Sequence, residues 1–153
     1  MLKVELKNKD NLFIRKNILL VGKTGVGKST LVNSFLNIDN AETGIGKPIT
    51  QNFNSYLSNP DSSFRLIDSK GIENSYQKAI DNIKLFISQK LLSNNKDEFI
   101  HCIWYCMTGT KYNDEDKDAI KILLSSYEDD CLPIIIVYTQ TIAEDEADEY
   151  LVK

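Results

Sequence analysis

The fold of this chain is decided by residues 22–30, which read Gly-Lys-Thr-Gly-Val-Gly-Lys-Ser-Thr. They match the phosphate-loop pattern G-x-x-x-x-G-K-[ST]. The apolar run at residues 18–21 is typical of a buried strand, and apolar residues at helical spacing follow over residues 31–36. This order of strand, glycine loop and helix is the context in which the motif is specific. The stretch therefore predicts a loop that binds the phosphates of a nucleoside triphosphate, rather than a glycine-rich turn that binds nothing.

The residue types in this loop suit a polyphosphate. Glycines allow consecutive backbone N–H groups to turn inward, and the N-terminus of the following helix adds a partial positive charge. The ammonium of Lys28 can span the outer phosphates, and the hydroxyl of Ser29 can ligate Mg²⁺.

Composition excludes several classes of function. The chain has 153 residues, which suits one domain with a sizeable core. A formal charge of −4 argues against a general nucleic-acid binder. No stretch approaches the ~20 apolar residues of a transmembrane segment, and residues 1–10 do not resemble a signal peptide. We therefore expect a cytoplasmic protein.

The three cysteines are Cys102, Cys106 and Cys131, an odd number that suggests reduced thiols. His101 lies beside two of them, which raises the alternative of a metal site. However, residues 99–106 read as a strand, and a matching second pair of ligands is missing. Buried cysteines acting as small hydrophobic residues are the preferred interpretation.

Strands and helices are expected to alternate along the chain. Strands are predicted at residues 2–7, 17–21, 52–58, 64–68, 99–106 and 133–138, and helices at residues 28–36, 75–92 and 114–126. Residues 37–51 are expected to form a polar connection, and the acidic residues 144–149 the solvated start of a helix.

The strand pattern also predicts the architecture. Continuous apolar strands such as residues 134–137 indicate burial on both faces, and hence a mostly parallel sheet covered by helices. The short turn between residues 52–58 and 64–68 requires that pair to be antiparallel. The expected fold class is a three-layer α/β fold of the P-loop NTPase type, with a mostly parallel sheet and one antiparallel edge strand.

A second motif narrows the choice among phosphate-loop proteins. Residues 65–71 read Arg-Leu-Ile-Asp-Ser-Lys-Gly, an apolar strand that ends in D-x-x-G. In a Mg²⁺-nucleotide site, an aspartate placed like Asp68 holds the metal, usually through water, and the backbone N–H of Gly71 can sense the terminal phosphate. Thr50, in the connection between the two motifs, can close on the metal.

With these motifs in order, nearly the whole chain resembles the translation-factor-related GTPases. Residues 109–116 look like the basic–aromatic–acidic stretch of septin-like, immunity-associated and chloroplast-import GTPases. The alternative is that Asp114 and Glu115 are helix N-terminal charges favoured by the dipole. The resemblance implies a single G domain over residues 1–153 that binds GTP or GDP with Mg²⁺.

The resemblance also assigns site residues. The nucleotide would be contacted by Gly22, Thr24, Gly25, Val26, Gly27, Lys28, Ser29, Thr30, Thr139 and Gln140. Mg²⁺ would be organised by Ser29, Thr50 and Asp68, and catalysis would involve Lys28, Thr50 and Gly71. Residues 40–51 and 69–77 would be switches. Thr43 is the alternative to Thr50, which is preferred because it lies just before the second strand.

The sequence departs from the family pattern after the D-x-x-G motif. Many small GTPases have a glutamine there that orients the attacking water, whereas this chain has Ile72, which cannot hydrogen-bond water. Glu73 is one residue further along. GTPases with an apolar residue at this position resemble a subset that recruits another group, often by dimerising across the nucleotide. Slow hydrolysis by the monomer is therefore expected.

A second departure concerns the base. The family reads guanine with [NT]-K-x-D after the fifth strand, and this chain has Thr139-Gln140-Thr141-Ile142 there. Gln140 can lie over the base, but Ile142 cannot accept hydrogen bonds. Glu144 or Asp145 is a candidate substitute; otherwise guanine preference should be weak, because a lost polar partner reduces discrimination.

Family G domains continue beyond the fifth strand with a helix, a strand and a final helix. The chain ends at Lys153, so we expect either a fragment or a missing layer supplied from elsewhere, and an exposed sheet edge that favours association.

The favoured function is a GTP-binding switch with slow hydrolysis, assisted by a partner or a homodimer and read by an effector that the sequence does not identify. The alternatives are a nucleotide-dependent scaffold, or pseudo-GTPase, and a P-loop ATPase or kinase. An ATPase or kinase would need an acceptor site or a catalytic base, and neither is evident.

Overall fold

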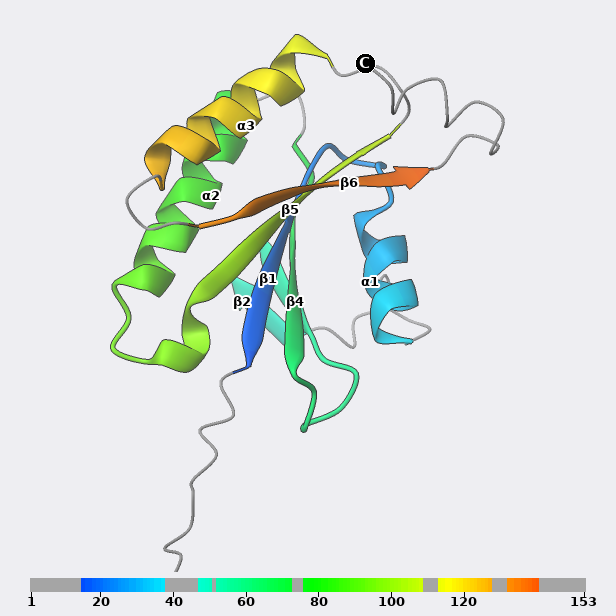
Figure 1. Ribbon diagram of the computed structural model, residues 1–153, viewed down its shortest axis with the longest axis vertical. Coiled ribbons are helices and arrows are strands. Elements are labelled where there is room, and N and C mark those ends of the chain that lie inside the picture. Colours follow the sequence, from blue (N-terminus) through cyan, green and yellow to red (C-terminus); the bar gives the residue numbers. More distant parts are fainter. Residues whose placement is uncertain are drawn as a thin grey trace, which may run out of the picture.

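The computed structural model describes residues 15–37, 47–50, 52–72, 76–108, 113–127 and 132–140 (Figure 1). The strands are β1 (Lys16–Val21), β2 (Lys47–Thr50), β3 (Phe53–Tyr56), β4 (Phe64–Ser69), β5 (Ile100–Thr108) and β6 (Ile134–Gln140). The helices are α1 (Lys28–Leu36), α2 (Tyr76–Leu91), α3 (Asp114–Ser126) and the short 3-10 helix η1 (Lys96–Glu98).

The strands form a six-stranded sheet in the order β2-β3-β4-β1-β5-β6. β1 pairs in parallel with β4 and β5, and β5 pairs in parallel with β6. β3 pairs antiparallel with both β4 and β2. The predicted α/β fold class with a mostly parallel sheet and one antiparallel strand is confirmed, but the antiparallel strand β3 is not the edge strand predicted, because β2 pairs outside it.

The predicted helices and strands within the described residues are present, with ends shifted by two residues at most. The exception is β2, which lies in the segment expected to be a connection and forms the edge of the sheet outside β3. This strand is four residues long and contains Pro48, which has no backbone N–H, so its sequence lacks a strand pattern. The predicted strand at residues 2–7 and the predicted helix start at residues 144–149 lie outside the described residues.

Right-handed crossovers place the helices on opposite faces of the sheet. α1 follows β1 and lies on one side of the sheet. α2 follows β4 and α3 follows β5, and both lie on the other side. α2 and α3 therefore cover one face and α1 the other, as Figure 1 shows. Among the described residues, no helix is long and apolar enough to span a membrane.

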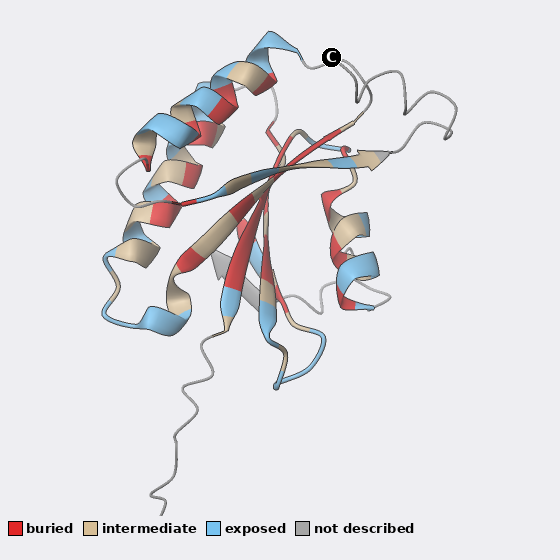
Figure 2. Cartoon of the chain, viewed as in Figure 1, coloured by how far each residue is buried: buried red, intermediate tan, exposed pale blue. Residues whose placement is uncertain are grey.

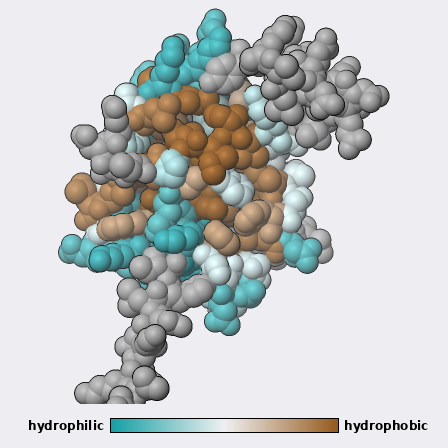
Figure 3. Space-filling view, viewed as in Figure 1, coloured by the Kyte–Doolittle hydropathy of each residue, from teal (hydrophilic) through white to brown (hydrophobic). Residues whose placement is uncertain are grey.

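The core lies on both faces of β1. Leu19 and Val21 pack toward α2 and α3, whereas Ile18 and Leu20 pack toward α1. Figure 2 shows the resulting burial along the central strands. At β6 the covering is thinner: Ile135 is 50% exposed, and Figure 3 shows apolar side chains gathered on the face that carries this strand.

This arrangement positions the predicted motifs. The carboxyl ends of parallel strands meet at one edge of a sheet, which is where open α/β folds bind ligands. The phosphate loop follows β1, the D-x-x-G segment ends β4, and Thr139 lies near the end of β6. All three therefore converge on the same edge.

Candidate functional site

The phosphate loop leads directly into α1. Gly27 is the N-cap residue of this helix and has φ 89°, in the left-handed region that favours glycine. No side chain caps the helix at this position. The first N–H groups of α1 are therefore available to an anion rather than to a capping side chain.

Lys28 is folded into the loop that it follows. Its side chain is buried, and its Nζ donates to the carbonyl oxygens of Gly22 at 3.1 Å and Lys23 at 3.0 Å. Burial lowers the pKa of the Lys28 ammonium, and the nearby Asp68 carboxylate partly opposes that shift. The Lys28 ammonium is thus folded back onto carbonyl oxygens of the loop itself.

Ser29 and Asp68 join the two motifs. The Ser29 hydroxyl donates to Asp68 Oδ2 at 3.2 Å, and the buried Oδ1 of Asp68 has no hydrogen-bond partner among the described residues. Burial raises the pKa of the Asp68 carboxyl, while Lys28 and the Ser29 hydroxyl lower it. A hydroxyl beside an unpartnered carboxylate oxygen suits Mg²⁺, which takes one or two protein oxygens and completes its shell with phosphates and water.

The D-x-x-G segment is attached to the phosphate loop through its backbone. Ile72 donates to the Gly22 carbonyl at 3.1 Å, and Thr24 donates to the Ile72 carbonyl at 3.4 Å. A Cβ added at Gly71 would lie 2.6 Å from the backbone N and Cα of Thr24. Gly71 is therefore required by close approach. Ile72 itself is 5% exposed and belongs to the core on the α2 side.

Thr139 supports the loop from the end of β6. Its hydroxyl donates to the carbonyl of Val26 and lies 3.3 Å from the carbonyl of Met107. The sequence predicts a nucleotide contact for this residue, and the structure places its hydroxyl on the loop backbone. Val26 is likewise buried, in the core on the α1 side.

A pocket of about 310 Å³ lies where these segments meet. It is lined by Thr24, Gly25, Gly27, Lys28, Ser29, Thr30, Asp68, Ser69, Lys70 and Gly71. Most of the predicted phosphate and metal residues are thus brought together. Ser69 and Lys70, the two variable positions of the D-x-x-G motif, were predicted only as part of a switch segment and not as residues that line the site.

The remaining predicted residues lie outside this pocket or outside the residues that the structure describes. Gly22, Val26 and Thr139 hold the loop rather than line the pocket. Thr50 ends β2 and Gln140 ends β6. The alternatives named from the sequence, which are Thr43, Glu73, Glu144 and Asp145, lie outside the described residues, as does Ile142.

A contact that the sequence did not predict joins the loop to α3. Lys23 Nζ lies 2.8 Å from Glu115 Oε2 and 4.0 Å from Asp116 Oδ2. Asp116 Oδ1 accepts from the Tyr105 hydroxyl at 2.9 Å, and the Asn113 side chain caps α3 by accepting from the Asp116 N–H. The acidic start of α3 therefore holds the loop in addition to favouring the helix dipole.

The residues weighed as a metal site are used differently. His101 Nδ1 accepts from the Asn17 backbone N–H at 3.1 Å. Cys102 and Cys106 are free thiols, and burial raises the pKa of Cys106 to about 12. Within the described ranges, no three His, Cys, Asp or Glu residues gather where they could hold a metal ion.

The chain is similar to a family of GTPases and to septins. A family model described as 50S ribosome-binding GTPase matches residues 17–140. Septin-8-B of Xenopus laevis and Septin-8 of Xenopus tropicalis are each 27% identical to it over 160 residues, which cover 90% of this chain and 37% of each relative. The chain thus spans little more than a third of the curated relatives it matches.

The fold also has a solved counterpart. The septin GTPase domain from Chlamydomonas reinhardtii superposes with a TM-score of 0.58 at 17% sequence identity, covering 89% of this chain and 57% of that one. At this identity the likeness is one of fold.

Proposed function

Because the chain belongs to the GTPase family described as 50S ribosome-binding GTPase, we propose that it is a GTP-dependent switch whose slow hydrolysis is completed by a partner. It is a GTP-binding G domain of the septin-like type. The rate of hydrolysis, the partner and the role of each residue are the substance of the proposal. Residues 1–153 would act as one such domain, in the cytoplasm.

The phosphate half of the site would work through the loop and the start of α1. Lys28 would leave the carbonyls of Gly22 and Lys23 for the outer phosphates, which are stronger acceptors. Ser29, Asp68 and Thr50 would hold Mg²⁺, which supplies positive charge where negative charge develops on the phosphates. Gly71 would present its backbone N–H to the terminal phosphate.

The observation that carries the slow-hydrolysis proposal is the position of Ile72. Its side chain is 5% exposed in the core, and its backbone is bonded to the loop on both sides. It therefore neither lines the pocket nor reaches a water molecule there. The group that orients the attacking water would have to come from Glu73 or from a second molecule, and a second copy across the nucleotide is the arrangement we favour.

The base half of the site rests on family membership. Gln140, directly after Thr139, would lie over the guanine ring. The position that supplies a carboxylate in the motif is Ile142, so discrimination against adenine should be weaker than a buried carboxylate would provide.

Parallel titrations with Mg²⁺-GTP and Mg²⁺-ATP test the nucleotide class. GTP should bind more tightly, and Lys28→Ala should weaken binding about 100-fold by removing a charged donor. Lys121→Ala, which removes an exposed lysine of α3, is the matched control and should bind like the parent. ATP binding at least as tight as GTP would refute the assignment.

Single-turnover hydrolysis at increasing protein concentration tests the assisted mechanism. The rate should be low in dilute protein and rise with concentration if a second copy completes the site. A rate of about 1 s⁻¹ or more in dilute protein would contradict it. Tight GTP binding without turnover at any concentration would instead favour the nucleotide-dependent scaffold.

A further inference from the structure

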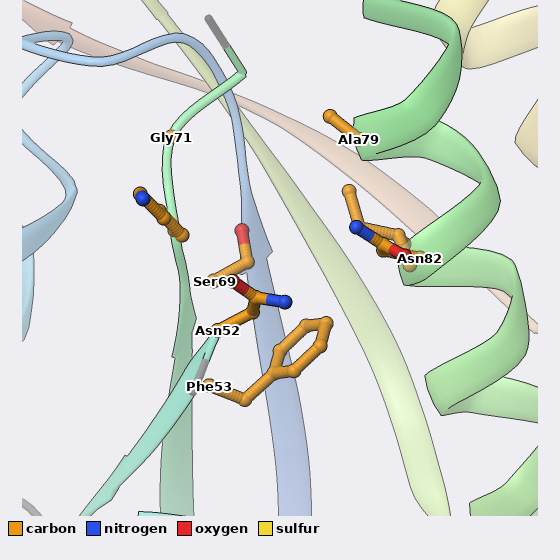
Figure 4. A pocket seen from close by; sticks show the side chains of 8 residues that line it. Asn52, Phe53, Ser69, Gly71, Ala79 and Asn82 are labelled. Atoms are coloured by element: carbon orange, nitrogen blue, oxygen red, sulfur yellow. The ribbon is translucent and has the colours of Figure 1, made fainter. Parts of the chain in front are cut away.

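A second pocket lies beside the nucleotide pocket, between α2 and the neighbouring ends of β3 and β4 (Figure 4). Its volume is about 70 Å³, so it admits a small chemical group rather than a nucleotide. The lining residues are Asn52, Phe53, Ser69, Lys70, Gly71, Ala79, Asn82 and Ile83.

The two pockets share a wall. Ser69, Lys70 and Gly71 line both of them, and Gly71 is packed against the backbone of Thr24 in the phosphate loop. Anything that shifts this three-residue segment changes both pockets at once. The second pocket is therefore placed to affect nucleotide binding without contacting the nucleotide.

Ser69 indicates that the pocket holds a polar group. Ser69 is 3% exposed, and its hydroxyl has no hydrogen-bond partner among the described residues. Figure 4 shows this hydroxyl directed into the space between β4 and α2, with the Asn82 side chain extending toward it from α2. A buried hydroxyl without a partner is unfavourable, so a hydrogen-bonding occupant is expected there.

The charge of the lining favours an anionic occupant. Lys70, which is exposed at the pocket rim, carries the one charge among the described lining residues, and none of these described residues carries a carboxylate. The Ser69 hydroxyl and the Asn82 amide are hydrogen-bond donors, while Phe53, Ala79 and Ile83 provide apolar walls. We propose that this pocket binds a single carboxylate group, and that its occupancy is coupled to the nucleotide through residues 69–71. The coupling rests on the proposed GTP-dependent function; the binding of a carboxylate does not.

Titration with acetate, followed by NMR of the backbone and Asn side-chain amides, tests the ligand class at constant ionic strength. Acetate should shift the signals of Ser69, Lys70 and Asn82 saturably. Acetamide, which has nearly the same shape without the charge, should not. Equal binding of acetamide and acetate, or no saturable shift with acetate, would overturn the proposal.

Variants of Asn82 test the location, because this residue lines the second pocket and not the nucleotide pocket. Asn82→Ala should weaken acetate binding about tenfold, as expected for loss of a hydrogen bond to a charged group. Asn82→Asp should abolish it by adding a like charge. Gln89→Ala and Gln89→Glu make the same changes at an exposed position of α2 and should leave acetate binding unaltered. An equal loss in the Gln89 variants would contradict the assigned location.

Repeating the titration with GDP and with a non-hydrolysable GTP analogue tests the coupling. The acetate affinity should differ at least about fivefold between the two states, and acetate should alter the ratio of the GTP and GDP affinities by the same factor, because coupling is reciprocal. Equal affinities in the two states would refute the coupling. Fluorescent GDP binding to the same samples separates the two proposals, since nucleotide can bind while acetate fails, or the reverse.

Blocked tripeptides with a central Glu or Gln distinguish the source of the carboxylate. Tighter binding of the Glu peptide than of acetate would identify an acidic side chain of a protein as the ligand. Saturable binding of acetate alone would identify a small free acid.

Discussion

Removing the Thr139 hydroxyl should loosen the phosphate loop, to which this hydroxyl donates from the end of β6. Thr139→Val keeps the β-branched shape of the side chain and replaces only the hydroxyl by a methyl group. The donor to the Val26 carbonyl is lost, and Val26 is only 7% exposed. An unpaired buried carbonyl costs about 1–3 kcal/mol, and the lower half of that range applies where water can reach the loop from the open pocket.

A loss of about 1–2 kcal/mol corresponds to a fall in the melting temperature of about 2–8 °C for a domain of this size. If this free energy holds the loop in its binding conformation, losing it would speed nucleotide release about 5- to 30-fold. Thr139→Ser keeps the hydroxyl and is the matched control.

Urea unfolding can be followed through the fluorescence of Trp104, the one tryptophan of the chain, and release through a fluorescent GDP. Thr139→Val should unfold at lower urea and release GDP faster, whereas Thr139→Ser should resemble the parent in release. If the valine and serine variants release GDP equally, the loop is not held by this hydroxyl.

Three further outcomes are expected. Gly71→Ala should lower both stability and the preference for GTP over GDP in competition assays, because its Cβ would meet the Thr24 backbone at 2.6 Å; an unchanged preference would count against the assigned role. Lys23→Glu and Glu115→Lys should each speed GDP release up to about fivefold, as expected for a pair that is partly exposed, and the double variant should restore it. Cys106, whose pKa is raised to about 12, should resist alkylation at pH 8 until the protein unfolds, as judged by mass spectrometry of the labelled peptide.

The fold was predictable wherever the local sequence pattern matches the helix or strand that the segment forms. The helix over residues 28–36 was predicted with its observed ends, because a glycine N-cap and an apolar periodicity mark it. The edge strand β2 was not predicted, because a four-residue strand with a proline is stabilised by its neighbour rather than by its own sequence. The strand pattern predicted the other five described strands and their mostly parallel arrangement, whereas their order in the sheet was not predicted.

The site was predictable as motifs but not as contacts. Lys28, Ser29 and Asp68 belong to patterns with known spacing, and the structure brings them together. The ion pair of Lys23 with Glu115 joins residues far apart in the chain, and no local pattern marks it. The second pocket is similarly invisible in the sequence, because three separate elements form it.

The bond from Thr139 to the Val26 carbonyl spans 113 positions, and this separation has a consequence for biosynthesis. The nucleotide-binding loop is among the first described segments to leave the ribosome, yet its support arrives only when β6 has been made and has paired with β5. Contacts of such long range form late, after the intervening chain has been ordered. A nascent chain lacking β6 should therefore bind nucleotide poorly, so that GTP would report on the completion of the sheet during synthesis.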